Sequence, residues 1–346
     1  MFFPPYAKEL NDYRQALVKG FIDNYKKYGY QQATPLPITS KEDKSVIFIG
    51  AAVSALKKDY VLPLNIPETG LVLAQDSVRT RNIRNMLNDE VNPKWGSYFT
   101  NIDTVRPYEG KEDAIFQALD FFKNTVGLED DELLLRVNSR DEELMKIVEM
   151  TGHPTVEYDA HPEKYYRHTI GIEGVYGENF NFAVKNRQSG EFSDVGNYII
   201  FRDKDSKKPL FLEVGFGDTS IMQQTCGLPH ILDCYPFPNH EALNTNHKFK
   251  DCIITSLALM REGLEPSSKD EQTKILYKYL RGLHYFANKS GLRIEETSKL
   301  IYHSENMIFG DVKAHQKIID LFNNKEQRIT ELNAATIMAL KKQRGE

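Results

Sequence analysis

Cysteine is scarce in this sequence, with only Cys226, Cys234 and Cys252 among 346 residues. An odd number cannot all pair within one chain, and none has the C-x-x-C spacing of a redox or zinc motif. The first residues, MFFPPYAKELNDYRQ, also lack the basic segment and apolar run of a secretory signal. Both absences predict a reducing compartment, and we expect a cytoplasmic location.

Long apolar runs and an excess of positive charge are also missing. No stretch approaches the roughly 20 apolar residues of a membrane-spanning helix, so we expect no membrane partner. Lys plus Arg total 44 against 49 Asp plus Glu, a net charge of −5. This balance excludes a surface covered with DNA-binding charge but allows a local basic patch. The histidines form no H-x-x-x-H or H-E-x-x-H pattern, so no metal site is predicted.

Apolar residues are plentiful, at 40% of the chain, and their spacing changes along the sequence. Up to about residue 240, helical segments alternate with short β-rich runs, among them 44–53, 69–80, 95–103, 131–138 and 208–217. From about residue 243 only amphipathic helices are predicted, the last over 310–343. We therefore predict an α+β fold, with an antiparallel sheet flanked by helices in residues 1–240 and an all-helical domain in residues 241–346.

Three arginines follow one of the predicted strands, in LAQDSVRTRNIRNM: Arg79, Arg81 and Arg84. On a strand, Arg79 and Arg81 would point to the same face because they are two residues apart. The planar guanidinium group suits phosphate and carboxylate ligands. The alternative is a solvated edge strand whose arginines form surface salt bridges.

Polar residues within apolar strands are the next candidates. Asn197 lies in DVGNYIIF and Glu213 in FLEVGFG, and a buried amide or carboxyl group must find partners. Gly215 and Gly217 predict a turn before a helix, where a backbone can approach a ligand closely. Each polar residue alone fits a satisfied core group equally well. Together they can bind an ammonium ion and a polar head group.

In order along the chain, these pieces resemble the catalytic region of alanyl-tRNA synthetase, a class II aminoacyl-tRNA synthetase. AQDSVRTRNIRNM is similar to motif 2 of that family, and DVGNYIIF to its EIWNLVFMQ segment. EVGFGDTSI is similar to motif 3, DTGMGLERI. DCIITSLALMREGLEPSS resembles the start of the helical domain that recognises the tRNA acceptor stem. The resemblance covers roughly residues 13–291 and consists in a collinear series of weak motifs.

The resemblance implies a class II synthetase-like fold, ATP with Mg as the energy source, and roles for particular residues. Arg79 matches the catalytic arginine that grips the ATP α-phosphate, with Arg81 and Arg84 beside it as nucleotide-binding residues. Asn197 would line the amino-acid pocket, and Glu213 would meet the substrate amine.

Further residues take their roles from the same resemblance. His168 stands where the family has an aromatic residue against the amino acid. Gly215 and Gly217 would shape the pocket floor. The tRNA contacts implied for the helical domain are Lys274, Lys278 and Arg281.

The sequence also departs from the family pattern. The motif 3 arginine, which would contact the ATP γ-phosphate, is Ser220 here, and the glutamate before it is Thr219. Two carboxylates of the family's TEIFYD segment become Asn181 and Lys185.

Three functions remain open. The first is an ATP-dependent ligase that activates a small amino acid or an analogue as its adenylate, for transfer to tRNA, a carrier protein or a small molecule. The second is a non-catalytic relative that binds an amino acid, a nucleotide-like ligand or a partner. The third is an enzyme rebuilt to act on an aminoacyl substrate.

Overall fold

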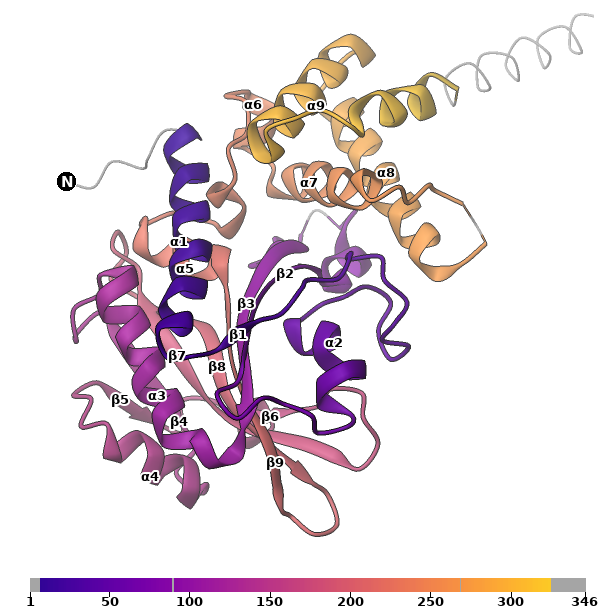
Figure 1. Ribbon diagram of the computed structural model, residues 1–346. Coiled ribbons are helices and arrows are strands. Elements are labelled where there is room, and N and C mark those ends of the chain that lie inside the picture. Colours follow the sequence, from indigo (N-terminus) through magenta and orange to yellow (C-terminus); the bar gives the residue numbers. More distant parts are fainter. Residues whose placement is uncertain (1–6, 89, 268, 325–346) are drawn as a thin grey trace, which may run out of the picture. The chain divides into compact units, whose positions relative to one another are not determined.

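The computed structural model describes residues 7–88, 90–267 and 269–324 (Figure 1). The described chain forms two compact units. The first comprises the residues up to Asn82 together with Pro93–Pro236, and the second comprises Ile83–Asn92 with the residues from Phe237 onward. The helix predicted over 310–343 lies partly outside the described residues. Within the described ranges, no helix is long and apolar enough to cross a membrane.

The first unit is built on one sheet. Its strands are β1 (Gln31–Gln32), β2 (Leu71–Val78), β3 (Tyr98–Pro107), β4 (Leu133–Val137), β5 (Val156–Tyr158), β6 (Arg167–His168), β7 (Val175–Lys185), β8 (Phe192–Asp203) and β9 (Pro209–Gly217). The strand order is β1-β2-β3-β9-β8-β7-β4-β5, and β6 pairs with β7. Only the β1/β2 and β4/β5 pairs are parallel. The predicted α+β class with a mainly antiparallel sheet is confirmed.

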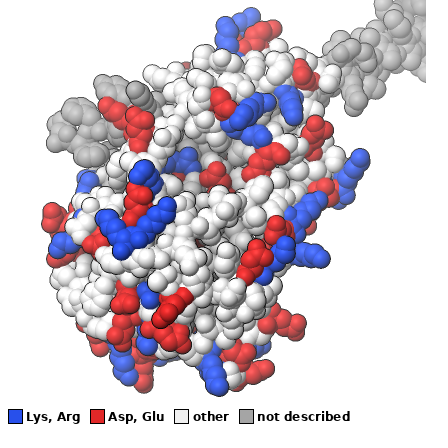
Figure 2. Space-filling model, viewed as in Figure 1, with Lys and Arg blue, Asp and Glu red and all other residues white. Residues whose placement is uncertain are grey.

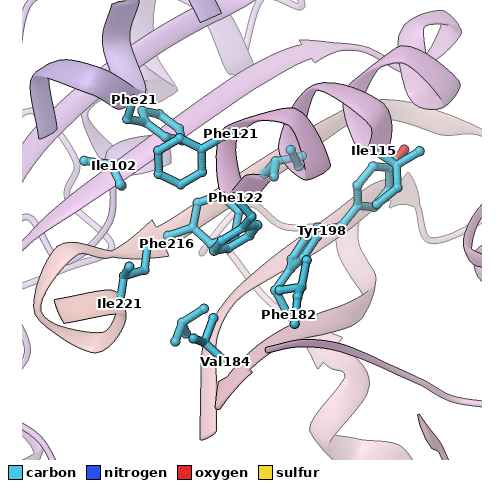
Figure 3. Packing of buried hydrophobic residues seen from close by; sticks show 14 of the residues in the cluster. Phe21, Ile102, Ile115, Phe121, Phe122, Phe182, Val184, Tyr198, Phe216 and Ile221 are labelled. Carbon is cyan, nitrogen blue, oxygen red and sulfur yellow. The ribbon is translucent and has the colours of Figure 1, made fainter. Parts of the chain in front are cut away.

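Helices cover the two faces of this sheet. They are α1 (Ala7–Lys27), α2 (Ala52–Leu56), α3 (Lys111–Asp120), α4 (Glu142–Met150) and α5 (Asp218–Thr225). The main core lies between α1, α3, α4, α5 and one face of the sheet, where aromatic rings dominate. Figure 3 shows Phe21, Phe121, Phe122 and Phe216 in this packing. Phe21 and Phe121 meet edge to face with centroids 5.0 Å apart, a geometry that adds to the gain from burial.

A second, smaller apolar cluster lies on the opposite face. There α2 packs against outward-facing strand residues such as Leu73, Val105 and Phe201. Between these apolar residues, the same face carries polar side chains in the middle of the strands. The side-chain alternation of β-strands therefore separates an aromatic core from a face that is partly polar.

The second unit is helical, with α6 (Glu241–Asn244), α7 (His247–Arg261), α8 (Glu271–Lys289) and α9 (Ile294–Phe309). The segment 83–92 packs within it, although the sequence prediction put that segment in the first domain. Met86 is buried beside Cys252 of α7, and the Lys248 ammonium donates to the Asn85 carbonyl. At Gly282 of α8 a Cβ would lie 2.7 Å from Cys252 Sγ, so a glycine is needed at this close approach.

Two local predictions are wrong. Residues 44–53 form no strand: they run as a loop into α2. The backbone of this segment makes single hydrogen bonds instead of the regular series of a β-ladder. Asn101 Oδ1 accepts from the Ala52 amide, and the Ile49 amide donates to the Ile38 carbonyl. Arg79 and Arg81 do not share a strand face either, because β2 ends at Val78 and Arg81 lies in a short 3₁₀ helix, Thr80–Asn85.

A buried ion pair ties α1 to the start of α5. Arg14 Nε lies 2.5 Å from Asp218 Oδ2, and Asp218 is fully buried. The same carboxylate accepts from the Thr100 backbone amide, and Arg14 also donates to the Thr100 hydroxyl. Asp218 is the residue that directly follows the glycines of EVGFGDTS. Through its contacts with Arg14 and Thr100, its carboxylate links α5 to α1 and β3.

We expect Arg14→Ala to lower the free energy of unfolding by about 3–5 kcal/mol, because it leaves the Asp218 carboxylate buried without its cation. Urea unfolding monitored by circular dichroism measures this loss. Lys19→Ala is the control on the same helix: Lys19 pairs with Asp23 on the surface, where an ion pair contributes about 0–1 kcal/mol. Equal losses in the two variants would contradict the role of the buried pair.

Candidate functional site

A row of polar side chains crosses the sheet of the first unit. Asp103 of β3 is paired with Gly215 of β9, and Gly215 with Asn197 of β8. Asn197 is paired with Asn181 of β7, and Asn181 with Arg136 of β4. Directly paired residues of antiparallel strands point to the same face, so these side chains form one transverse row. The face is the one opposite the aromatic core.

Glu213 stands one step along the strand from this row. It is paired with Val105 and Ile199, two residues beyond Asp103 and Asn197, and therefore faces the same side. Both Asp103 and Glu213 are buried, with exposed fractions of 0% and 6%. The structure thus brings Glu213 next to Asn197, two residues that the sequence predicted for one pocket, and adds Asp103, which the prediction missed.

Asp103 and Glu213 interact as a carboxyl pair. Burial, and then the charge of Glu213, raise the pKa of Asp103 well above its usual range. Burial also raises the pKa of Glu213, opposed by its interaction with the Asp103 side chain and by the positive charge of Arg79. Two buried carboxyl groups in contact cannot both ionise readily, so the pair holds a proton. We assign that proton to Asp103, because the interaction between the two groups raises the pKa of Asp103 and lowers that of Glu213.

Gly215 makes room for this pair. A Cβ at Gly215 would lie 2.5 Å from Asp103 Oδ2, so a side chain here would displace the carboxyl group. The predicted turn is wrong in its details, since Gly215 lies within β9 and Gly217 ends it. Neither glycine has a positive φ. Gly215 is required for the space it leaves, not for a special backbone conformation.

Arg79 follows the end of β2, and its positive charge lowers the pKa of both Asp103 and Glu213. Its Nε donates to the Gly50 carbonyl at 2.9 Å, and its guanidinium lies over the Phe99 ring, 4.8 Å from the centroid. Part of the side chain is exposed to solvent. The protein atoms packed around the guanidinium group desolvate it, and this desolvation, followed by the charge of Arg81, lowers the pKa of Arg79. A group that is both accessible and desolvated by its neighbours is suited to bind a ligand anion.

His168 enters from β6, which pairs with β7 so that His168 is opposite Gly177. Burial and then the nearby Arg79 charge lower its pKa, while its interaction with the Asn179 side chain opposes the shift. The imidazole is therefore neutral near pH 7 and can donate from one nitrogen and accept at the other. Arg79, His168, Asn197 and Glu213 belong to one polar site.

The remaining predicted residues are Arg81 (whose charge lowers the pKa of Arg79), Arg84 and three basic residues of α8. Arg84 belongs to the segment grouped with the helical unit, whereas Arg79 and Arg81 belong to the sheet unit. Lys274, Lys278 and Arg281 are exposed along α8. Figure 2 shows acidic and basic side chains interspersed over the face in view. No described group of three or more His, Cys, Asp or Glu side chains is arranged to hold a metal ion.

Sequence reasoning missed Asp103, although a signal for it was present. In YFTNIDTV, Asn101 and Asp103 alternate with apolar residues in the way that singled out Asn197 and Glu213. The amides Asn179 and Asn181 show the same pattern in NFNFAV. Polar residues at alternate positions on several neighbouring strands indicate a shared polar face, but the register that aligns them is not visible in one sequence.

Comparisons with known proteins concern the fold. No family model matches the sequence, and no curated protein matches it. The chain is similar to apo histidyl-tRNA synthetase from S. aureus, with a TM-score of 0.41 and 10% identity over 65% of this chain and 72% of that one. It is also similar to Entamoeba histolytica asparaginyl-tRNA synthetase with asparaginyl-adenylate, with a TM-score of 0.42 and 10% identity over 68% and 67% of the chains. The resemblance to the alanyl enzyme stays a prediction from the sequence.

Asp103→Asn should flatten the dependence of stability on pH. The folded protein keeps a proton on Asp103 that the unfolded chain releases at the ordinary carboxyl pKa. The wild type therefore loses stability as the pH rises from that range through the folded pKa. The amide keeps the shape of the protonated carboxyl group without titrating, so the variant should not show this decline. Urea unfolding across a pH series measures both curves.

The control is Asp159→Asn, an exposed carboxyl group whose pKa is lowered by hydrogen bonds from Ser139. Asp159 contributes stability that is lost as the pH falls, so its replacement changes the stability curve only at acid pH. The decline in stability toward high pH should stay as in the wild type. An equally steep decline in Asp103→Asn would show that Asp103 holds no extra proton.

Proposed function

We propose that the sheet unit binds a small amino acid and activates it with ATP as an adenylate, for transfer to tRNA or another acceptor. The observation that carries this proposal is that one cation, Arg79, lies near enough to Glu213 and Asp103 for its charge to lower the pKa of both. A zwitterionic amino acid needs both charges in one small site: a carboxylate partner for its ammonium group and a cation for its carboxylate.

The proposed chemistry depends on position and charge. Glu213 binds the amine of the substrate. Arg79 faces both the substrate carboxylate and the α-phosphate of ATP, which that carboxylate attacks. Bringing the two reactants together removes much of the entropic barrier of a bimolecular step. As the carboxylate oxygen bonds to phosphorus and pyrophosphate leaves, negative charge grows on the phosphoryl oxygens, and the fixed guanidinium stabilises it.

The donor set offers little for a protein-bound Mg²⁺. Such an ion prefers carboxylate oxygens, and the positions at which the resemblance implies carboxylates carry Asn181 and Lys185. Lys185 instead pairs with Asp131 on the surface. We therefore assign no step to a metal held by these residues.

A second function, binding without catalysis, is favoured by one specific feature. At the start of α5 the chain carries Asp218, Thr219 and Ser220, and Asp218 is engaged by Arg14. No arginine is present on α5 to hold the far phosphates of ATP. An amino-acid sensor would keep Glu213 and Asn197 and need no such arginine.

Amino-acid-dependent exchange of labelled pyrophosphate into ATP separates the two functions. We expect exchange with a small amino acid, reduced about 10- to 150-fold in Arg79→Ala, since one charge-assisted hydrogen bond contributes roughly 1.5–3 kcal/mol. Arg140→Ala is the control, because Arg140 is exposed and pairs only loosely with Glu163. No exchange with any amino acid, combined with a higher Tm in the presence of one, would support the sensor.

The tRNA acceptor has its own test on α8. If tRNA is the acceptor, its binding should weaken steeply with salt, because phosphate contacts release counterions. Replacing Lys274, Lys278 and Arg281 together by alanine should reduce the slope of log K against log salt by up to about three units. Filter binding over a salt series measures this slope. Binding that is absent, or independent of salt, would remove tRNA as the acceptor.

A further inference from the structure

The polar row continues beyond Asn181 to an ion pair near the sheet edge. Arg136 Nη1 lies 2.6 Å from Asp194 Oδ1, and Arg136 Nε lies 2.7 Å from Glu157 Oε2. Tyr165 donates its hydroxyl to Asp194 Oδ2 at 2.9 Å. Asp194 thus lies beside a permanent cation, and its two oxygens accept from Arg136 and from Tyr165.

A β-bulge turns Asp194 toward the row. Phe182 pairs with Gly196, but the next residue of β7, Ala183, pairs with Asp194, so that Val195 is an extra residue in β8. Because of this extra residue, Asp194 lies on the same face as Asn181. Without the bulge, its side chain would point to the aromatic core.

Asp194 fixes which way the Asn181 amide points. Asn181 Nδ2 donates to Asp194 Oδ2 at 2.8 Å, and the reverse orientation would place two acceptors together. Asn181 Oδ1 therefore faces the other way and accepts. Both neighbouring amides, those of Asn179 and Asn197, donate their Nδ2 groups to this single oxygen.

The two outer amides are oriented in turn. Since Asn197 gives its NH₂ group to β7, its carbonyl oxygen points away from β7, to the side of β9, where Glu213 and Asp103 lie. The Asn179 carbonyl oxygen is buried and lacks a hydrogen-bond partner at normal geometry, with His168 as its close neighbour. On the side of β9 the site therefore presents mainly acceptors: the Asn197 carbonyl oxygen beside the carboxyl pair of Glu213 and Asp103.

We propose that Asp194 is a positioning residue: through Asn181 it holds Asn197 with its carbonyl oxygen toward β9, which makes the site selective for a primary ammonium group. An ammonium ion has three N–H donors and no acceptor, so it matches this set. A hydroxyl group in its place has one donor and no charge. The inference rests on the proposed amino-acid site and adds what sets its preference for an amine.

The test compares L-alanine with L-lactate, which has a hydroxyl group in place of the amine, by isothermal titration calorimetry. Methylammonium and acetate serve as separate probes for the two charges. We expect wild-type protein to bind L-alanine and methylammonium, and to prefer L-alanine over L-lactate by tenfold or more. In Asp194→Asn the amides can reverse, and the preference should fall by about tenfold or more.

Glu157→Gln is the matched control. It breaks the other ion pair of Arg136 but leaves the contact between Asp194 and Asn181, so the preference should stay at the wild-type value. Asn181→Leu is the second variant, used if Asp194→Asn does not fold. It removes the central amide and should cause the same loss of preference.

Three results would overturn the inference: equal binding of L-alanine and L-lactate by the wild type, a preference unchanged in Asp194→Asn (or in Asn181→Leu where that variant replaces it), or no binding of any ammonium probe. These outcomes are separate from the failure of the proposed activation. Pyrophosphate exchange driven equally well by both acids would leave activation standing and remove the amine selectivity. Amine-selective binding without pyrophosphate exchange would leave the amine selectivity standing and remove the proposed activation.

Discussion

The pairing register of the central antiparallel strands is the constraint on which the rest of the structure depends. Side chains alternate between the two faces, so the register that places Asp103, Asn197 and Asn181 in one row also sends Ile102, Tyr198 and Phe182 to the aromatic core. A slip of one residue would exchange the two sets. Buried carboxyl groups would then enter an apolar core, at a cost of several kcal/mol. The site and the core therefore enforce the same register.

Within that frame the site carries groups that are unfavourable to bury, and its arrangement offsets their cost. The proton of Asp103 removes one of two neighbouring charges, and Arg79 stabilises the other on Glu213. The hydrogen-bonded side-chain amides end at the ion pair of Asp194 and Arg136. Because Asp194 only accepts from Asn181, this end fixes the orientation of every amide in the row. Such polar networks lower stability when a member is unpaired and specify one arrangement when all are satisfied. A ligand ammonium group would supply donors to these acceptors.

Much of the fold followed from the sequence, because apolar periodicity and turn residues act locally. The strands β2, β3, β4, β8 and β9 and the long helices are where the patterns put them. The loop at 44–53 was misread because its apolar residues are buried without pairing, and Asn101 caps α2 from a distant strand. Asn197, Glu213 and Arg79 were each singled out from the sequence as site residues, because each is visible alone. Asp103 and the bulge at Asp194 depend on register, which only the structure reveals.

The central claim is that Glu213, Asp103 and the outward amide oxygen of Asn197 form the amine half of an amino-acid site, with Arg79 at the carboxylate half. A crystal structure with bound L-alanine tests it most directly. The account predicts the ammonium nitrogen about 3 Å from Glu213 and from Asn197 Oδ1, with the carboxylate directed to Arg79. An amino acid bound elsewhere, or one with its carboxylate toward Glu213, would contradict it.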